Sequence, residues 1–222
     1  MPVISGLKTN AVTIGTSNTD TNNFQLRSNA DGTATLARKS DGSGGDVLTV
    51  DGSGIVAMPS GSKNLTLMTA QATTSGTSID FTGIPSWAKR ITVMFNGVST
   101  NGTSPPQIQL GAGSIDSTGY SSSQGGIINS GVLGTLASVT TTGILISNNM
   151  AIADTLGGSL VISLMGSNIW TASGITNKAN TAYVGICGGN KTLSGVLDRV
   201  RITTLNGTDT FDAGSVNILY EG

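Results

Sequence analysis

Residues 23–58 carry the clearest structural signal in the chain, because apolar and polar residues alternate there in short segments. The segments are Asn23-Phe24-Gln25-Leu26-Arg27, Thr33-Ala34-Thr35-Leu36-Ala37-Arg38, Asp46-Val47-Leu48-Thr49-Val50 and Ile55-Val56-Ala57-Met58. Such alternation is typical of half-buried β-strands. The connections Asn29-Ala30-Asp31-Gly32, Asp41-Gly42-Ser43-Gly44-Gly45 and Asp51-Gly52-Ser53-Gly54 contain Asp-Gly or glycine pairs, which tolerate the positive φ of tight hairpins. We predict a short N-terminal β-meander over residues 1–60.

This meander holds too few large apolar residues to form a core of its own. Burial of apolar surface contributes roughly 25 cal/mol per Å². The apolar surface of this segment is too small for that contribution to offset the conformational entropy lost when the segment becomes ordered. We therefore expect identical copies to pack together, and we predict that the protein is a homotrimer. Ser60-Gly61-Ser62-Lys63 is interpreted as a linker to a second domain over residues 64–222.

The second domain is predicted to be a β-sandwich of jelly-roll type. Strands are expected at residues 65–73, 78–81, 90–95, 107–110, 143–147, 159–164, 182–187, 198–204 and 215–220, with turns at Asn96-Gly97, Asn101-Gly102, Gly157-Gly158, Gly188-Gly189-Asn190 and Asn206-Gly207. The Ser/Gly-rich residues 114–130 resemble a long surface loop. Helix is expected for at most a turn or two near Pro85-Ser86-Trp87-Ala88.

Composition argues against several classes of function. Of 222 residues only 10% are charged, the net charge is −1, histidine is absent and Cys187 is the single cysteine. A hydrolase of the triad type needs a histidine-like base, and a zinc site needs Cys or His ligands. Eleven Lys and Arg balanced by twelve acids give no basic stripe for nucleic acid. With no apolar run long enough to cross a bilayer and no secretory signal pattern, we expect synthesis in a cytoplasm and no membrane insertion.

Two stretches resemble proteins of bacteriophage particles. Residues 46–56 resemble short units of tail-fibre and head-fibre proteins. Residues 80–99, followed by the ending at residues 214–221, resemble a β-domain of phage virion proteins. The resemblance implies a homotrimeric fibre or appendage of the virion, made in the host cytoplasm, whose N-terminal part binds other virion proteins and whose distal β-domain faces a host glycan or protein. A capsid decoration protein that stabilises the head and a polysaccharide-degrading tailspike are the alternatives.

Aromatic residues supply the candidate contacts. Tyr120 lies in the Ser/Gly-rich segment and is predicted to be an exposed receptor contact, since binding loops favour Tyr among Ser, Gly and Asn. Trp170, among small polar residues, is a candidate receptor contact that could stack on a sugar ring, with packing between subunits as the preferred interpretation. Phe81, Trp87 and Phe95 are assigned to the core.

The aspartates are not expected to form a catalytic or metal site. Glycan cleavage uses two carboxylates across a groove, and Asp116, Asp154, Asp198, Asp209 and Asp212 would be the candidates. Asp41, Asp46 and Asp51 recur in a glycine-rich stretch, but their order fits no calcium motif. Turn formation is the preferred interpretation, so we predict no enzyme activity, no metal and no cofactor.

Overall fold

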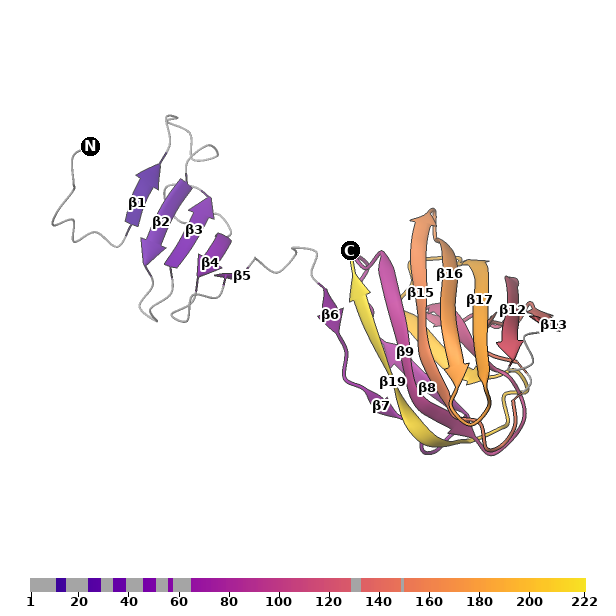
Figure 1. Ribbon diagram of the computed structural model, residues 1–222. Coiled ribbons are helices and arrows are strands. Elements are labelled where there is room, and N and C mark those ends of the chain that lie inside the picture. The colour runs from indigo at the N-terminus through magenta and orange to yellow at the C-terminus, as the bar shows by residue number, and fades with distance from the viewer. Residues whose placement is uncertain are drawn as a thin grey trace. The chain divides into compact units, whose positions relative to one another are not determined.

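The structure, a computed structural model, shows an all-β chain in two compact units, Met1–Ser62 and Lys63–Gly222 (Figure 1). It describes residues 11–14, 24–28, 34–38, 46–50 and 56–57 of the first unit, and residues 65–128, 133–148 and 150–222 of the second. Every element in these ranges is a strand, and every strand pairing is antiparallel. The all-β prediction is confirmed.

The first unit contains one sheet in which strands follow one another in chain order. Its strands are β1 (Ala11–Ile14), β2 (Phe24–Ser28), β3 (Ala34–Arg38), β4 (Asp46–Val50) and β5 (Val56–Ala57). The strands β2 to β5 each overlap one of the four alternating segments in the sequence, and β1 precedes them. The predicted turns at residues 29–32, 41–45 and 51–54 and the linker at 60–63 lie outside the described residues, as do Asp41 and Asp51.

The second unit is a sandwich of two antiparallel sheets. The larger sheet has the order β13-β12-β17-β16-β15-β9-β19-β6, with β7 also paired to β19, and the smaller has the order β11-β10-β18-β8, with β14 paired to β10. The strands of the larger sheet are β6 (Thr66–Leu67), β7 (Gln71–Ala72), β9 (Arg90–Thr100), β12 (Tyr120–Ile128), β13 (Leu133–Thr140), β15 (Leu156–Gly166), β16 (Ile169–Lys178), β17 (Tyr183–Thr192) and β19 (Phe211–Glu221). Those of the smaller sheet are β8 (Ser78–Thr82), β10 (Pro106–Ala112), β11 (Ser114–Ile115), β14 (Ile144–Leu145) and β18 (Arg199–Thr204).

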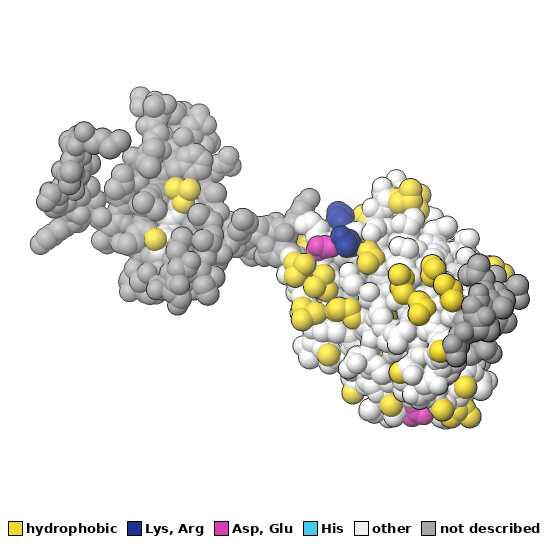
Figure 2. Space-filling view, in the orientation of Figure 1, with side chains coloured by type: hydrophobic (Ala, Val, Ile, Leu, Met, Phe, Trp, Pro, Cys, Tyr) yellow, Lys and Arg dark blue, Asp and Glu magenta, His cyan; other side chains and the backbone are white. Residues whose placement is uncertain are grey.

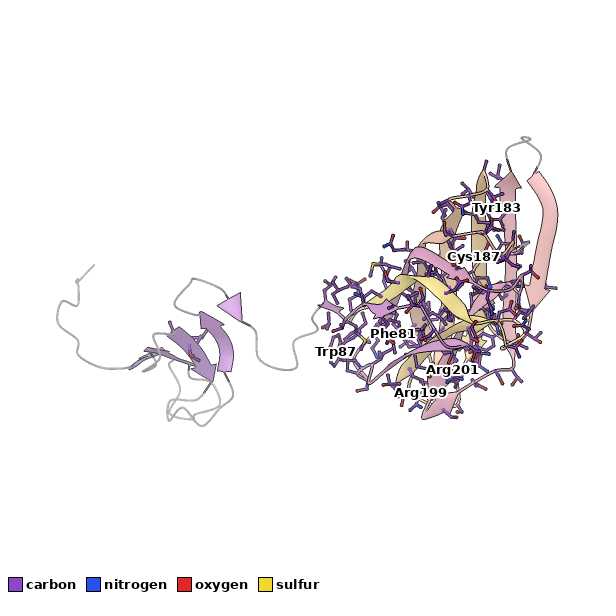
Figure 3. All side chains as sticks on the ribbon, turned by 90° about the horizontal axis from the view of Figure 1, so that it is seen from below. Phe81, Trp87, Tyr183, Cys187, Arg199 and Arg201 are labelled. Carbon is purple, nitrogen blue, oxygen red and sulfur yellow. The ribbon has the colours of Figure 1, made fainter. Side chains whose placement is uncertain are left out.

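The core lies between the two sheets and follows from the period-two pattern of their strands. On β9, Ile91, Val93 and Phe95 are buried and alternate with less buried neighbours, because successive side chains point to opposite faces. Phe81 of β8 belongs to the same core cluster. Trp87, labelled in Figure 3, is half-buried and packs against this core. Its ring centroid lies 5.4 Å from that of Tyr220.

Some of the predicted glycine turns are irregularities within long strands. Asn96-Gly97 does not end β9, which continues to Thr100. Gly97 has a φ of 63°, and the pairing of β9 with β19 shifts register here. Gly214, with a φ of 93°, faces Gly97 so closely that a Cβ atom on it would lie 2.4 Å from the Gly97 carbonyl. The glycines therefore permit a β-bulge, which adds a residue and twists the strand without ending it.

The expectation of a long surface loop over residues 114–130 is wrong. Two strands occupy most of it, β11 and β12, and β12 is hydrogen-bonded on both sides, to β13 and β17. Because both backbone edges of β12 are paired, the low β-propensity of its Ser and Gly residues is overridden by the sheet. The same holds for Gly188-Gly189-Asn190, which continues β17 and is not a turn.

A buried lysine packs against a tyrosine ring at the end of β17. Lys191 lies opposite Tyr120 on β12, and its Nζ is 5.2 Å from the centroid of the Tyr120 ring. This Nζ also lies 2.8 Å from Oδ2 of Asp116 and donates to the carbonyl of Thr118 at 2.7 Å. The cation therefore fastens the connection between β11 and β12 to the inner face of the sheet.

A second buried lysine packs against a tyrosine ring at the start of β17. Lys178 lies opposite Tyr183, with its Nζ 4.6 Å from the ring centroid and 3.2 Å from Oδ2 of Asp154. Both charged side chains are almost fully buried. Burial alone would raise the pKa of Asp154, but hydrogen bonds from Thr181 and from the Ala151 N–H, together with Lys178, outweigh it and lower that pKa. Asp154 therefore stabilises the fold while ionised, and this contribution is lost as the pH falls below about 4 through its folded-state pKa.

We predict that Lys178→Met lowers the free energy of unfolding by about 3–5 kcal/mol, because it leaves the Asp154 carboxylate buried without its cation. The matched control is Asp80→Asn, which breaks the half-exposed pair in which Arg201 Nη2 lies 2.7 Å from Asp80 Oδ2. That change is expected to cost under about 1 kcal/mol. Urea unfolding followed by circular dichroism measures both, and similar losses in the two variants would contradict the prediction.

Candidate functional site

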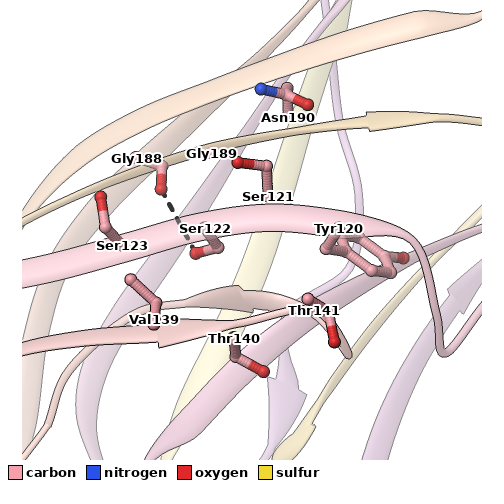
Figure 4. Close-up of a pocket in the computed structure, with 10 residues that line it drawn as sticks. All are labelled: Tyr120, Ser121, Ser122, Ser123, Val139, Thr140, Thr141, Gly188, Gly189 and Asn190. Carbon is pink, nitrogen blue, oxygen red and sulfur yellow. Dashed lines mark hydrogen bonds between the residues drawn. The ribbon is translucent and has the colours of Figure 1, made fainter.

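An open groove of about 900 Å³ lies beside β12 (Figure 4). Its walls come from the first half of β12, the end of β13 and the second half of β17, segments that are far apart in the sequence. The residues that line it are Tyr120, Ser121, Ser122, Ser123, Val139, Thr140, Thr141, Gly188, Gly189 and Asn190. The lining therefore consists of hydroxyl groups, one amide, exposed backbone, one aliphatic side chain and one phenol.

Only some of these polar groups are free to meet a ligand. Ser122 is buried, donates to the carbonyl of Gly188 at 3.2 Å and accepts from the N–H of Leu145 at 2.9 Å. The side chain of Thr140 is 2.9 Å from that of Thr142. Ser121, Ser123, Thr141 and Asn190 are exposed. Exposed hydroxyls and an amide can both donate and accept hydrogen bonds, so the groove is suited to a neutral polar ligand.

A glycine keeps one wall of the groove close to β12. Gly189 pairs with Ser122, and a Cβ atom on Gly189 would lie 2.7 Å from the carbonyl oxygen of Ser121 and 3.0 Å from the Cβ of Ser122. Any larger residue would push β17 away from β12. The glycines of this segment, interpreted from sequence as a turn, therefore serve the close approach of two strands.

Tyr120 lies at one end of the groove, but it is not the exposed loop residue that the sequence predicted. It begins β12, and only 3% of its surface is exposed. Its hydroxyl accepts from the N–H of Leu110 at 2.6 Å and donates to the carbonyl of Asp116 at 2.8 Å. Burial raises the pKa of this hydroxyl well above its ordinary value, so it stays neutral. Tyr120 joins the two sheets and has little surface left for a receptor.

Trp170 is also buried, with 3% of its surface exposed, and therefore cannot stack on a sugar ring. It belongs to β16, where Trp170 and Ala172 point inward while Ile169 and Ser173 are exposed. This inward position also argues against packing between subunits. Its Nε1 has no hydrogen-bond partner among the described residues. The strand period places Trp170 in the core, and that period was hidden in the sequence by small polar neighbours.

The aspartates considered from sequence are engaged in separate local contacts. Asp116 and Asp154 pair with the buried lysines. Asp198 lies 2.8 Å from Arg199, and hydrogen bonds from Arg199 lower the pKa of the Asp198 carboxyl. Asp209 accepts from the N–H of Ser104 at 2.9 Å, and Asp212 accepts from the hydroxyl of Ser99. Within the described ranges no three Asp, Glu, His or Cys side chains are grouped so as to hold a metal ion.

Comparisons with known proteins add no family assignment. No family model matches the chain, and no curated protein and no solved structure matches it either. In the described part of the chain there is no helix of the length and apolarity needed to cross a membrane.

Cys187 is the one potential thiol nucleophile, and the structure places it on the inner face of β17. Its surface is 3% exposed, and its Sγ lies 3.5 Å from the carbonyl oxygen of Gly174. Burial raises the pKa of the thiol to about 12. Because the thiolate is the reactive form, this environment makes Cys187 inert.

We predict that iodoacetamide at pH 8 modifies Cys187 in the folded chain more than about a thousandfold more slowly than in the urea-unfolded chain, since the thiolate fraction differs by that factor. Mass spectrometry of the intact protein measures both rates. Comparable alkylation rates in the folded and the unfolded chain would show that the Cys187 thiol is not buried.

Proposed function

We propose that this chain is a non-enzymatic structural protein of a bacteriophage virion, a short homotrimeric fibre or appendage on tail or head that contributes to recognition of the host surface. The jelly-roll-like second unit faces outward, and the first unit attaches to other virion proteins. The observation that carries the recognition role is the open groove beside β12, whose exposed side chains, apart from Val139, are neutral donors and acceptors.

The chemistry of the groove favours a neutral glycan of the host surface as its ligand. Ser121, Ser123, Thr141 and Asn190 offer hydroxyl and amide groups that complement the hydroxyls of a sugar. None of the described residues that line the groove is Lys, Arg, Asp or Glu, so a charged ligand would lose hydration there without gaining an ion pair with them. The strand backbones fix the positions of these groups in advance, which lowers the entropy lost on binding.

The first unit supports the proposed trimer. Its described strands form a single sheet, which has two faces, and the described residues of this unit include no second layer to pack against either of them. Packing against symmetry-related copies would cover one of them. The same packing would give three grooves on one particle appendage, and several weak sites bind a cell surface far more strongly than one.

We predict that Ser123→Arg weakens binding of the full chain to surface polysaccharide purified from the host bacterium by at least about tenfold, because an arginine side chain fills the groove and brings an unpaired charge. The control is Thr82→Arg, which places the same side chain at an exposed position on β8 of the smaller sheet. Biolayer interferometry with the immobilised polysaccharide gives both affinities.

Three outcomes would overturn the proposal. Equal binding by Ser123→Arg and the unmodified chain would remove the groove as the recognition site. Shortening of the polysaccharide during incubation would identify an enzyme. Failure of an antibody against the full chain to label phage particles in electron micrographs would remove the virion assignment.

A further inference from the structure

The outward face of the larger sheet carries a cluster of exposed aliphatic residues on three neighbouring strands. Ile175 on β16 lies directly opposite Ile186 on β17, and Val184 on β17 lies directly opposite Ile127 on β12. Val184 and Ile186 are two residues apart and so share a face. These four residues are called the aliphatic face below. Ile175 is 61% exposed and Ile186 is 58% exposed.

Charged side chains are missing from this region of the sheet. On β15, β16 and β17, which the structure describes throughout, the two lysines Lys178 and Lys191 are buried, and the outward positions hold Ser, Thr, Asn, Gly, Met and aliphatic residues. Figure 2 shows yellow and white side chains over these strands, with a blue and magenta group beyond them. Arg90 and Glu221 form a pair on the outward face of β9 and β19, 3.1 Å apart, and neutralise each other.

Soluble proteins normally protect such a surface. Along a strand of an antiparallel sheet, the positions on the outward, solvent-facing side are usually polar or charged. Aliphatic pairs placed directly opposite each other on an exposed sheet face leave adjoining apolar surface in water. A contiguous patch of this kind marks an interaction site more often than scattered single residues do.

The electrostatics favour a second copy of the same chain as the partner. A charged partner surface would be desolvated against the aliphatic face without an opposite charge to pair with. This chain, in contrast, is only 10% charged and has a net charge of −1, so its copies neither repel each other nor bring unpaired charges to the contact.

The sheet offers enough surface for a contact centred on the aliphatic face. The five strands β12, β17, β16, β15 and β9 lie side by side and are each 9 to 11 residues long. With about 4.8 Å between strands and about 3.3 Å per residue, their outward face measures on the order of 800 Å². The groove takes only the part at residues 121–123 and 188–190, so the remainder stays within the roughly 600–1,000 Å² per partner that specific interfaces bury.

We infer that the aliphatic face is the contact by which the second unit packs against a second copy of this chain, with Ile175 and Ile186 at its centre and the surrounding Ser, Thr and Asn side chains as its polar rim. This arrangement of an apolar centre and a polar rim is the usual anatomy of a protein interface. The inference rests on the self-association in the proposed function and assigns that association to a surface.

The test compares Ile175→Lys and Ile186→Lys in the full chain with Val196→Lys. Val196 is 56% exposed and lies in the connection between β17 and β18, so it matches the other two in exposure and chemistry but not in position. Sedimentation velocity at a series of concentrations gives the dissociation constant of the assembly. The two variants on the aliphatic face should raise it at least about tenfold, and Val196→Lys should leave it unchanged.

Two other outcomes overturn the inference, and they can be distinguished from each other. If the unmodified chain assembles and both isoleucine variants assemble equally well, the aliphatic face is not the contact, and the proposed function still stands. An unmodified chain that sediments as a single copy removes both. If either lysine variant has lost the circular dichroism of the folded chain, Ile175→Thr and Ile186→Thr replace them, since threonine keeps the β-branch and the strand propensity but not the apolar surface.

Discussion

The scarcity of charge is the constraint on which the second unit depends. Each long strand sends its apolar residues inward to the core and must fill its outward positions from what remains, which in this chain is mostly Ser, Thr, Asn, Gly and a few aliphatic residues. The neutral groove and the aliphatic face are both consequences of this distribution. They lie on neighbouring parts of the same sheet and share strands β12 and β17.

The few charged side chains that point inward bind the connecting segments to the ends of strands β16 and β17. Lys178 and Lys191 stand at the end of β16 and of β17, each opposite a tyrosine and each beside an aspartate from a connection. A buried lysine is unfavourable unless its charge is paired, so these clusters determine where the connections must lie. Through Asp116 and Tyr120 one of them fixes the start of β12 and, with it, one end of the groove.

Much of the fold could be predicted from the sequence, and what was missed has a physical reason. Segments rich in β-branched residues, such as Ser78–Thr82 and Arg199–Thr204, correspond to strands because their propensity and their pattern agree. Tyr120–Ile128 contains mostly Ser, Gly and Gln and becomes a strand through its two pairing neighbours, which local composition does not reveal. The groove escaped prediction for the same reason, since its walls meet only once β12, β13 and β17 are aligned. Tyr120 and Trp170 were expected at a surface because their neighbours are polar, yet strand alternation turns both rings inward.

Hydroxyl-radical footprinting of the unmodified full chain at micromolar concentration tests most directly whether the uncharged outer face is covered. In the isolated chain Ile175, Ile186 and Val196 are exposed to nearly the same extent, at 61%, 58% and 56%. If copies pack on this face, Ile175 and Ile186 will be oxidised several-fold more slowly than Val196 once intrinsic reactivity is corrected for, because their surface is removed from water. Equal corrected rates at all three positions would contradict the account.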